Sequence, residues 1–520
     1  MTSIRWDDHD RVIRVAVCAV VLLAAVLTVT PWPVGAFQDD AIYTVLAKSL
    51  ATGHGYRLLN LPGEPNATHY PPGYPMVLAL LWRLWPSFPD NIVLFKFANA
   101  AFLSAAALAM YAFVRRRLSW GVPAAAGLAV AGTASIVVLL ITGVVLSEPL
   151  FMALLIGALL YTEDVVDRPT AMRAFAAGIA LGTLALVRTI GVAALPAAVL
   201  ALLVRGRWRS LAPLVGGALC CLLPWQWWVA AHASEVAPVL TGKFGAYTPW
   251  LADGYRAGGI PFLRQVLTAN LQSLDGMFSF AFMPVAAVAP RGAAFVAVVL
   301  LGLAGTVMLV RSAPVTAGFL AAYVAISLVW PFEPTRFFLA IWPLVLLAMA
   351  LPVRRLWQWR PPAATPRALR GIGLAGAAAL LIGFGTYNVR GFRDQWWTSI
   401  QRDAGQRAKP IAEWIARNTH PGDVLATEDD LIVYLYTGRQ ALPTSTFLAT
   451  ERVRPLSDQE DLAAVRAILA SYRPRFFITA SKQGIQSATA LTKLDPPELR
   501  PYAGMPNALI FERVDTPPSR

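Results

Sequence analysis

The residues best suited to acid–base chemistry stand together in one stretch near the start of the chain, Gln38–Pro75. Asp39 and Asp40 follow an uncharged run that begins after Arg14. A carboxylate in this place can take a proton from a hydroxyl group during a reaction. An Asp can equally cap a helix, and the helix dipole favours a second Asp beside it. The residues leave both roles open, one for each carboxylate or both together.

The second half of the stretch reads THYPPGYP and covers residues 68–75. Its prolines fix φ, so the segment can hold a shape without the hydrogen bonds of a sheet. His69 is one of only five histidines in the chain and can carry a proton near neutral pH. Tyr70 and Tyr74 can line a site, although tyrosines of this kind also form belts at membrane–water interfaces.

A helix is predicted between these two halves, over Ala41–Thr52. Apolar side chains recur every four residues from Ile42 to Leu50, which is typical of an amphipathic helix that lies on a membrane surface. Asp39 is the predicted N-cap of this helix, and Gly53 is its predicted stop.

The composition indicates an integral membrane protein. The chain has 520 residues, of which 57% are hydrophobic and only 14% are charged, against about 25% charged in an average soluble protein. Uncharged runs long enough to cross a bilayer number about eleven. We therefore expect an α-helical polytopic membrane protein.

The net charge of +14 is concentrated in short arginine clusters between these runs. Such clusters mark cytoplasmic loops rather than a site for nucleic acid. If every run spans the membrane, three arginine clusters fall on the same side of it. These clusters are the arginines before the first run, Arg115–Arg117 and Arg205–Arg209. The N-terminus is then cytoplasmic, and residues 38–75 form the first external loop.

One apolar run, residues 276–290, is only fifteen residues long. At that length it is more typical of an interfacial or re-entrant segment than of a span. If it did span, every later segment would be inverted and the basic loop 354–370 would face outward, against the charge rule.

The tail, residues 391–520, changes to alternating helical and strand-like patterns and is predicted to be a small α/β domain outside the cytoplasm. Strands are expected at 423–427 and 475–480, and helices at 404–418 and 458–471. All three cysteines lie in apolar runs, so this domain can form no disulfide. The predicted division is a transmembrane domain over residues 1–390 and an extracytoplasmic domain over residues 391–520.

A resemblance to a known family rests on the order of several short motifs. DD-x-x-Y (Asp39 to Tyr43) and HYPPGYP come first, followed by a run that ends in RRR. LSEPLF (146–151), ALVRTIG (185–191) and WPFEPTRFFLAIWP (330–343) then follow. This order resembles the polyprenyl-phosphate-sugar-dependent glycosyltransferases of the GT-C superfamily. It is most similar to the family 39-like group of protein O-mannosyltransferases and lipid A aminoarabinose transferases.

The resemblance implies a GT-C fold and an inverting glycosyltransferase in which Asp39 is the general base. The donor would be a sugar on polyprenyl phosphate, and the acceptor a hydroxyl of an envelope glycan, lipid or protein. Two departures stand out, because the family's Asp-Glu pair is Asp-Asp here and its basic residue before Pro-Pro is replaced by His69-Tyr70. The first keeps a base, while the second removes a contact to the donor phosphate.

The resemblance also names candidate binding residues. An outward-facing arginine could stabilise the leaving phosphate, whereas the same arginine could instead reach lipid headgroups. Glu333 stands three residues before Arg336 and could pair with it, and Glu148 could simply begin a helix. Besides Asp39 and Asp40 as catalytic residues, the candidates for donor or acceptor binding are Tyr43, Arg57, His69, Tyr70, Tyr74, Glu148, Arg188, Glu333 and Arg336.

No cofactor is expected beyond the lipid-linked sugar phosphate itself, although a divalent metal at His69 or Asp40 is possible. The expected location is the plasma (inner) membrane, with the bilayer, the donor lipid and the acceptor as partners and with no nucleic acid. A transporter or lipid flippase is one alternative, but it would place charges within the spans. A non-enzymatic envelope scaffold is a second alternative, but it would leave the loop 38–75 without a function.

Overall fold

A computed structural model describes residues 8–283, 291–359, 367–505 and 508–514. The contacts divide the chain into two compact units. The first, called the membrane unit here, comprises Met1–Thr30, Lys96–Trp225 and Arg264–Thr398. The second, called the loop-and-tail unit, comprises Pro31–Phe95, Gln226–Leu263 and Ser399–Arg520. The predicted domain boundary at residue 390 stays a prediction.

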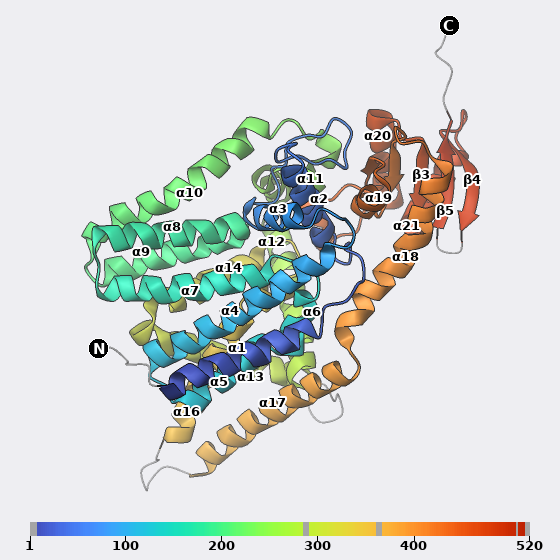
Figure 1. Ribbon diagram of the computed structural model, residues 1–520. Helices are drawn as coiled ribbons and strands as arrows, with labels where there is room; N and C mark the ends of the chain where they lie inside the picture. Colours follow the sequence, from blue (N-terminus) through green and yellow to red (C-terminus); the bar gives the residue numbers. More distant parts are fainter. Residues whose placement is uncertain (1–7, 284–290, 360–366, 506–507, 515–520) are drawn as a thin grey trace. The chain divides into compact units, whose positions relative to one another are not determined.

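The long apolar runs form helices that lie side by side in the membrane unit (Figure 1). The uncharged runs predicted to span form helices, and the run between Arg117 and Glu148 is divided into two of them. These helices are α1 (Asp8–Val26), α4 (Ile92–Leu118), α5 (Val122–Thr133), α6 (Ile136–Thr142), α7 (Glu148–Asp167), α8 (Ala171–Val187), α9 (Ala194–Val204), α10 (Leu211–His232), α13 (Arg291–Ser312), α14 (Pro314–Val329), α16 (Trp342–Gln358) and α17 (Arg367–Arg393).

By length and composition, five helices among the described residues can each cross a membrane, or six if the bent pair α5 and α6 counts as one span. The axes of that pair differ by 49°. Helices α8, α9 and α14 are shorter, and α14 packs closely on α9. The predicted architecture, a polytopic helical bundle with a small sheet near the C-terminus, is confirmed.

Small residues let some of these helices approach closely. A Cβ added at Gly178 of α8 would lie 2.0 Å from the carbonyl oxygen of Leu214 in α10. A Cβ at Gly217 of α10 would lie 2.1 Å from the carbonyl oxygen of Phe175. Close packing through small residues is the usual way in which helices associate in lipid.

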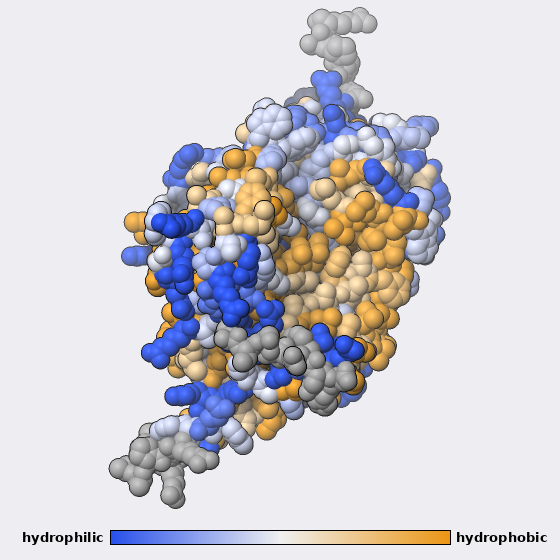
Figure 2. Space-filling view, turned by 60° about the vertical axis from the view of Figure 1, so that its left-hand side comes forward, coloured by the Kyte–Doolittle hydropathy of each residue, from blue (hydrophilic) through white to orange (hydrophobic). Residues whose placement is uncertain are grey.

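Hydrophobic side chains cover a broad area of the molecular surface (Figure 2). In α10, α13 and α17, the stretches that are apolar enough to cross a membrane are only 17%, 22% and 17% buried, respectively. Lipid tails can cover such apolar surface, whereas water cannot do so cheaply. Exposed apolar residues on these helices include Leu219, Leu223, Val299, Leu303, Leu381 and Ile382.

The remaining short helices of the membrane unit connect the longer ones. They are η1 (Thr189–Ala193), η2 (Trp208–Ser210) and α15 (Thr335–Ala340). Helix α12 (Tyr247–Phe282) ends within the short apolar run at 276–290. The question of whether the run spans the membrane lies outside the described residues, because positions 284–290 are not among them.

The tail forms a five-stranded sheet in the order β2-β1-β3-β5-β4. Strands β1 (Leu425–Thr427), β2 (Ala441–Leu442) and β3 (Phe476–Thr479) are parallel, and β5 (Ala508–Arg513) pairs antiparallel with β3 and with β4 (Leu499–Met505). The helices of the tail are α18 (Trp396–Asn418), α19 (Asp430–Thr437), η4 (Ala449–Arg452), α20 (Asp458–Tyr472) and α21 (Lys482–Thr492). The strands predicted at 423–427 and 475–480 and both predicted helices are therefore confirmed.

Segments distant in sequence complete the loop-and-tail unit. Its first segment holds α2 (Asp39–Ala51) and α3 (Gly73–Leu84), and its second holds η3 (Pro238–Leu240), α11 (Thr241–Phe244) and the start of α12. The backbone N–H of Ala441 donates to the carbonyl oxygen of Asn60 at 2.8 Å. Lys243 Nζ lies 2.7 Å from the buried carboxylate of Asp430. The segment that contains Asn60 therefore packs with the tail.

The prediction that α2 lies on the membrane surface is wrong. Its residues from Asp40 to Ala47 are all buried, because α2 packs against both α3 and α19. Asp39 is also not the N-cap. The N-cap is Gln38, whose side chain makes no capping hydrogen bond, and Asp39 is the first residue of the helix.

Candidate functional site

The two adjacent aspartates occupy very different surroundings in the loop-and-tail unit. Asp40 is fully buried, and its carboxylate accepts hydrogen bonds from the backbone N–H groups of Gly35 (2.7 Å), Ala36 (3.1 Å) and Phe37 (3.1 Å). Burial raises the pKa of Asp40, and the three N–H donors oppose that rise. Asp40 therefore holds the turn that leads into α2.

Asp39 presents its carboxylate differently. Its side chain is half-buried, and Oδ1 accepts a hydrogen bond of 2.8 Å from the hydroxyl of Tyr70. Burial and the neighbouring Asp39 carboxylate raise the pKa of Tyr70, so this phenol stays protonated and donates. The structure thus brings together one residue from each half of the predicted catalytic loop.

An aromatic cluster holds Tyr70 in place. The ring of Tyr43 meets the rings of Tyr70 and Tyr74 edge to face, with centroids 5.4 Å and 5.1 Å apart. Tyr43 and Tyr74 are both buried. Pairs of this geometry stabilise a fold by about 0.5–1.5 kcal/mol beyond the area that they bury. These two tyrosines position Tyr70 relative to α2.

His69 is buried, and its Nδ1 lies 2.7 Å from the carbonyl oxygen of Gly245. A carbonyl only accepts, so Nδ1 carries the proton and donates. The ring packs on Tyr247, with centroids 3.9 Å apart. Burial lowers the pKa of His69 to about 4, and the imidazole is therefore neutral at physiological pH.

These contacts give no support to a metal role for His69 or Asp40. Among the described residues, no group of three or more His, Cys, Asp or Glu side chains is placed to hold a metal ion. Arg57 serves the loop itself, since its backbone pairs with Asn66 and its Nη1 donates to the carbonyl oxygen of Glu64 at 3.3 Å.

Sequence reasoning missed one polar cluster that fixes this loop. Glu235 accepts from the backbone N–H of Asn66 at 2.8 Å and from its side-chain amide at 2.9 Å, and it lies 2.5 Å from Nδ1 of His232. Although partial burial opposes it, these donors lower the pKa of Glu235 to about 2. The only signal in the sequence is the spacing of His232 and Glu235 at the end of an apolar run.

A second group of candidate residues lies in the membrane unit. Glu148 is fully buried as the first residue of α7, and Oε1 lies 2.9 Å from Nη1 of Arg188 and 2.8 Å from Nη2 of Arg336. Arg188 stands between α8 and η1, and Arg336 is the second residue of α15. Three stretches that are far apart in sequence therefore meet here.

Two guanidinium groups face one carboxylate in this cluster. The side chain of Arg336 is 23% exposed, whereas that of Arg188 is 10% exposed. Arg188 also donates to the hydroxyl of Ser147 at 3.2 Å. A planar guanidinium that is held in this way suits an anionic phosphate or carboxylate group.

Neighbouring polar contacts fix the ends of the helices that carry the cluster. The side-chain amide of Asn99 donates to the carbonyl oxygens of Val144 and Leu146, just before α7. Glu333 accepts from the hydroxyls of Ser273 (2.9 Å) and Thr335 (2.7 Å) at the start of α15. Glu333 therefore helps to shape the turn before Arg336.

The fold of this chain is similar to that of two solved structures. ArnT from Cupriavidus metallidurans, solved with undecaprenyl phosphate bound, matches with a TM-score of 0.53 and 13% identity over 96% of this chain and 98% of that one. The oligosaccharyltransferase of Archaeoglobus fulgidus, solved with zinc and sulfate, matches with a TM-score of 0.50 and 13% identity over 89% of this chain and 68% of that one. No protein-family model and no curated protein matches the sequence.

Proposed function

We propose that this protein is an integral membrane glycosyltransferase that moves a sugar from a polyprenyl-phosphate donor to a hydroxyl of an envelope acceptor. The observation that carries the proposal is the difference between the two aspartates. The Asp40 carboxylate accepts hydrogen bonds from three backbone N–H groups, whereas Asp39 is half-buried and accepts a hydrogen bond from Tyr70. The fold that the chain shares with ArnT, a protein crystallised with undecaprenyl phosphate, agrees with a lipid-linked donor.

In the proposed reaction, Asp39 takes the proton of the acceptor hydroxyl as its oxygen forms a bond to the anomeric carbon of the sugar. The bond between that carbon and the phosphate oxygen breaks on the opposite face, so the configuration inverts. The electron pair leaves with polyprenyl phosphate. General-base assistance of this kind is worth about 10²–10⁴-fold in rate.

The Tyr70 hydroxyl has a positioning role in this scheme. Its hydrogen bond to Oδ1 orients the Asp39 carboxylate for contact with the acceptor. A carboxylate offers about four acceptor positions, so one donor does not block proton uptake.

The leaving phosphate gains negative charge as the bond breaks, and a fixed cation stabilises it without reorganisation. We propose Arg188 and Arg336 of the membrane unit for this role, because the Glu148 carboxylate holds both guanidinium groups. The ion pairs with Glu148 hold both guanidinium groups close to the same carboxylate. The alternatives of a transporter, a lipid flippase or a scaffold are not favoured by the fold.

We further propose that the N-terminus is cytoplasmic and that the reaction takes place on the outer side of the plasma membrane. The arginine clusters between the apolar runs support this orientation. The acceptor is then a glycan, lipid or protein of the cell envelope.

Analysis of the envelope in a strain that lacks this protein tests the function. We expect the loss of one sugar from an envelope glycoconjugate and the accumulation of a polyprenyl phosphosugar, both restored by the wild-type gene. An unchanged envelope together with an unchanged pool of polyprenyl phosphosugars would reject the proposal.

Substitution of Arg336 tests the role of the arginine cluster. We expect Arg336→Ala to raise the KM for the lipid donor at least tenfold, because a charge-assisted contact to the phosphate is lost. Arg336→Lys should restore only part of the affinity, since Lys lacks the planar fork. The exposed Arg168 offers a control in Arg168→Ala, and equal donor KM values for Arg336→Ala and this control would remove Arg336 from the site.

A further inference from the structure

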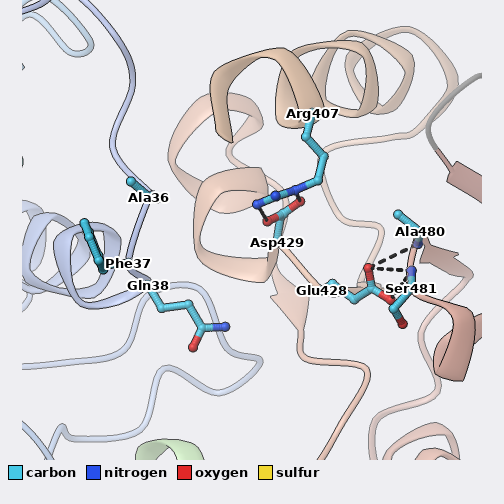
Figure 3. Close-up of a pocket in the computed structure, with 9 residues that line it drawn as sticks. Ala36, Phe37, Gln38, Arg407, Glu428, Asp429, Ala480 and Ser481 are labelled. Atoms are coloured by element: carbon cyan, nitrogen blue, oxygen red, sulfur yellow. Dashed lines mark hydrogen bonds and ion pairs between the residues drawn. The ribbon is translucent and has the colours of Figure 1, made fainter. Parts of the chain in front are cut away.

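A polar cavity of about 430 Å³ lies within the loop-and-tail unit, beside the turn that carries the two aspartates. One wall is the backbone of Gly35–Gln38, and the other is formed by Arg407, Glu428, Asp429 and Ser481 (Figure 3). Binding pockets usually measure about 300–1,000 Å³ and contain a few fixed polar groups. This cavity is not explained by the reaction proposed above.

The sheet places the cavity where open α/β sheets bind ligands. Strand β1 connects through α19 to β2 on one side, while β3 lies on its other side. Glu428 and Asp429 directly follow β1, and Ser481 stands just after β3. The crevice at the carboxyl ends of parallel strands, where the chain reverses its order, is a preferred binding place in such sheets.

The polar groups of the wall are held rigidly. The Glu428 carboxylate accepts from the Thr479 hydroxyl at 2.5 Å and from the backbone N–H groups of Ala480 and Ser481 at 3.1 Å and 3.0 Å. Nε and Nη2 of Arg407 each donate to one oxygen of Asp429, at 3.3 Å and 3.2 Å. Figure 3 shows the contacts of Glu428 with Ala480 and Ser481 and the contacts between Arg407 and Asp429. A ligand therefore meets fixed groups, which lowers the entropy lost on binding.

The charge of the wall selects the class of ligand. Glu428 and Asp429 face the single guanidinium of Arg407, so the wall carries one surplus negative charge. Glu428 already occupies the N–H groups at the start of α21, where an anion would otherwise bind. A phosphate or other anion is disfavoured, whereas hydroxyl groups can both donate to carboxylates and accept from a guanidinium.

The opposite wall adds an amide group. The side chain of the exposed Gln38 extends toward the cavity (Figure 3) and can both donate and accept hydrogen bonds. The backbone of this wall holds Asp40 through its N–H groups, and Gln38 immediately precedes Asp39. A ligand in the cavity therefore lies against the turn that carries the proposed base.

We infer that this cavity is an acceptor subsite and that the acceptor is an uncharged, hydroxyl-rich saccharide. The inference rests on the proposed glycosyltransferase function and names its acceptor class. The tail domain then selects the acceptor while the first loop carries out the proton transfer.

A binding experiment without the donor tests the subsite separately from catalysis. The probe is the soluble oligosaccharide pool released from the envelope of the deletion strain, tagged with a diazirine and separated into neutral and acidic fractions. Photolysis with the full-length protein should label peptides that contain residues 35–38, 428–429 or 480–481, and untagged neutral oligosaccharide should compete.

Two variants and one control make the result specific. Asp429→Asn and Arg407→Ala should each reduce labelling at least fivefold. Arg466→Ala should not, although it too breaks an exposed ion pair of the tail, with Glu498 at 2.5 Å. Thermal unfolding of each variant shows whether it is folded, and Asp429→Asn keeps the side-chain volume if Arg407→Ala is unstable.

Acceptor kinetics at saturating donor provide the second measurement. We expect Asp429→Asn to raise the KM for the neutral oligosaccharide pool at least fivefold and to leave the donor KM within twofold of wild type. Labelling outside the cavity, labelling by the acidic fraction alone, or no labelling, as expected of a protein or lipid acceptor, would overturn the subsite. If the wild-type protein transferred no sugar but the neutral probe still labelled the cavity, the proposed function would fail and the saccharide site would stand.

Discussion

Two neighbouring aspartates of the same chain have different surroundings, because their oxygen atoms face different donors. Asp40 is buried and accepts hydrogen bonds from three backbone N–H groups, whereas Asp39 is half-buried and accepts a hydrogen bond from the Tyr70 hydroxyl. From the sequence alone, the capping role and the proposed catalytic role could not be assigned to one aspartate or the other. The turn at Gly35–Gln38 directs the N–H groups of Gly35, Ala36 and Phe37 at the Asp40 carboxylate.

The buried His69 makes stability depend on pH. Its pKa is about 4 in the folded protein and about 6.5 in an unfolded chain. The unfolded state therefore binds a proton first as the pH falls from about 6.5 to about 4, and the stability contributed by neutral His69 is lost over this range. The loss is on the order of 3 kcal/mol, from about 1.4 kcal/mol per pKa unit.

We expect His69→Asn to reduce this pH dependence. Asn can still donate to the Gly245 carbonyl but cannot take up the proton. The thermal midpoint of the purified protein should fall less between pH 7.5 and pH 4.5 in His69→Asn than in wild type. The exposed His54 provides a control in His54→Asn, and identical pH curves for wild type and His69→Asn would contradict the assignment.

Single residues were predicted more readily than their partners. Asp39, His69, Glu148 and both membrane-unit arginines stood out by type and position, but the sequence did not show which groups they meet. Tyr70 reaches Asp39 across 31 positions, and Arg336 reaches Glu148 across 188. Such pairs depend on how helices pack, and residue spacing carries no information about that packing.

At the scale of elements, the turn before α2 is the part of the site that depends most on its backbone. Gly35 has φ +110°, and a Cβ there would lie 2.2 Å from Cδ1 of Ile432 in α19. An L-residue other than glycine rarely adopts such a conformation, which costs about 1–3 kcal/mol.

Gly35→Ala should therefore lower the thermal midpoint and abolish most of the sugar-transfer activity, because the turn that holds Asp40 and precedes Asp39 is displaced. Gly422→Ala is the matched control, since a Cβ there meets no atom within 4 Å. Circular dichroism melting and a transfer assay check both variants. Wild-type behaviour of Gly35→Ala in both assays would show that the turn geometry does not matter.

Helix α2 shows the limit of periodicity at this scale. The four-residue spacing from Ile42 to Leu50 correctly predicted a helix. The same spacing predicted that only one face of the helix would be buried, whereas most of its residues are buried. Helix α2 is also covered by α19, which lies almost 400 residues further along the chain. Its own sequence pattern predicts only that it is apolar.

At the scale of the whole molecule, the proposed orientation can be tested directly. The tail should be outside and the arginine clusters inside the cytoplasm if the charge rule holds. In a variant without the three natural cysteines, Ser471→Cys should react with an impermeant thiol reagent in cells whose outer barrier has been removed. Arg207→Cys should react only after the membrane is permeabilised. Both positions are exposed, and the opposite pattern would invert the proposed topology.

The most direct test of the central claim is sugar transfer by Asp39→Asn. Asn keeps the size of the side chain and can still accept the hydrogen bond from Tyr70, but it cannot take a proton from the acceptor. With purified protein, polyprenyl phosphosugar and saturating acceptor, we expect kcat to fall by about 10²–10⁴-fold, with a thermal midpoint close to that of wild type. A folded Asp39→Asn variant that transfers sugar at the wild-type rate would contradict the assignment of Asp39 as the general base.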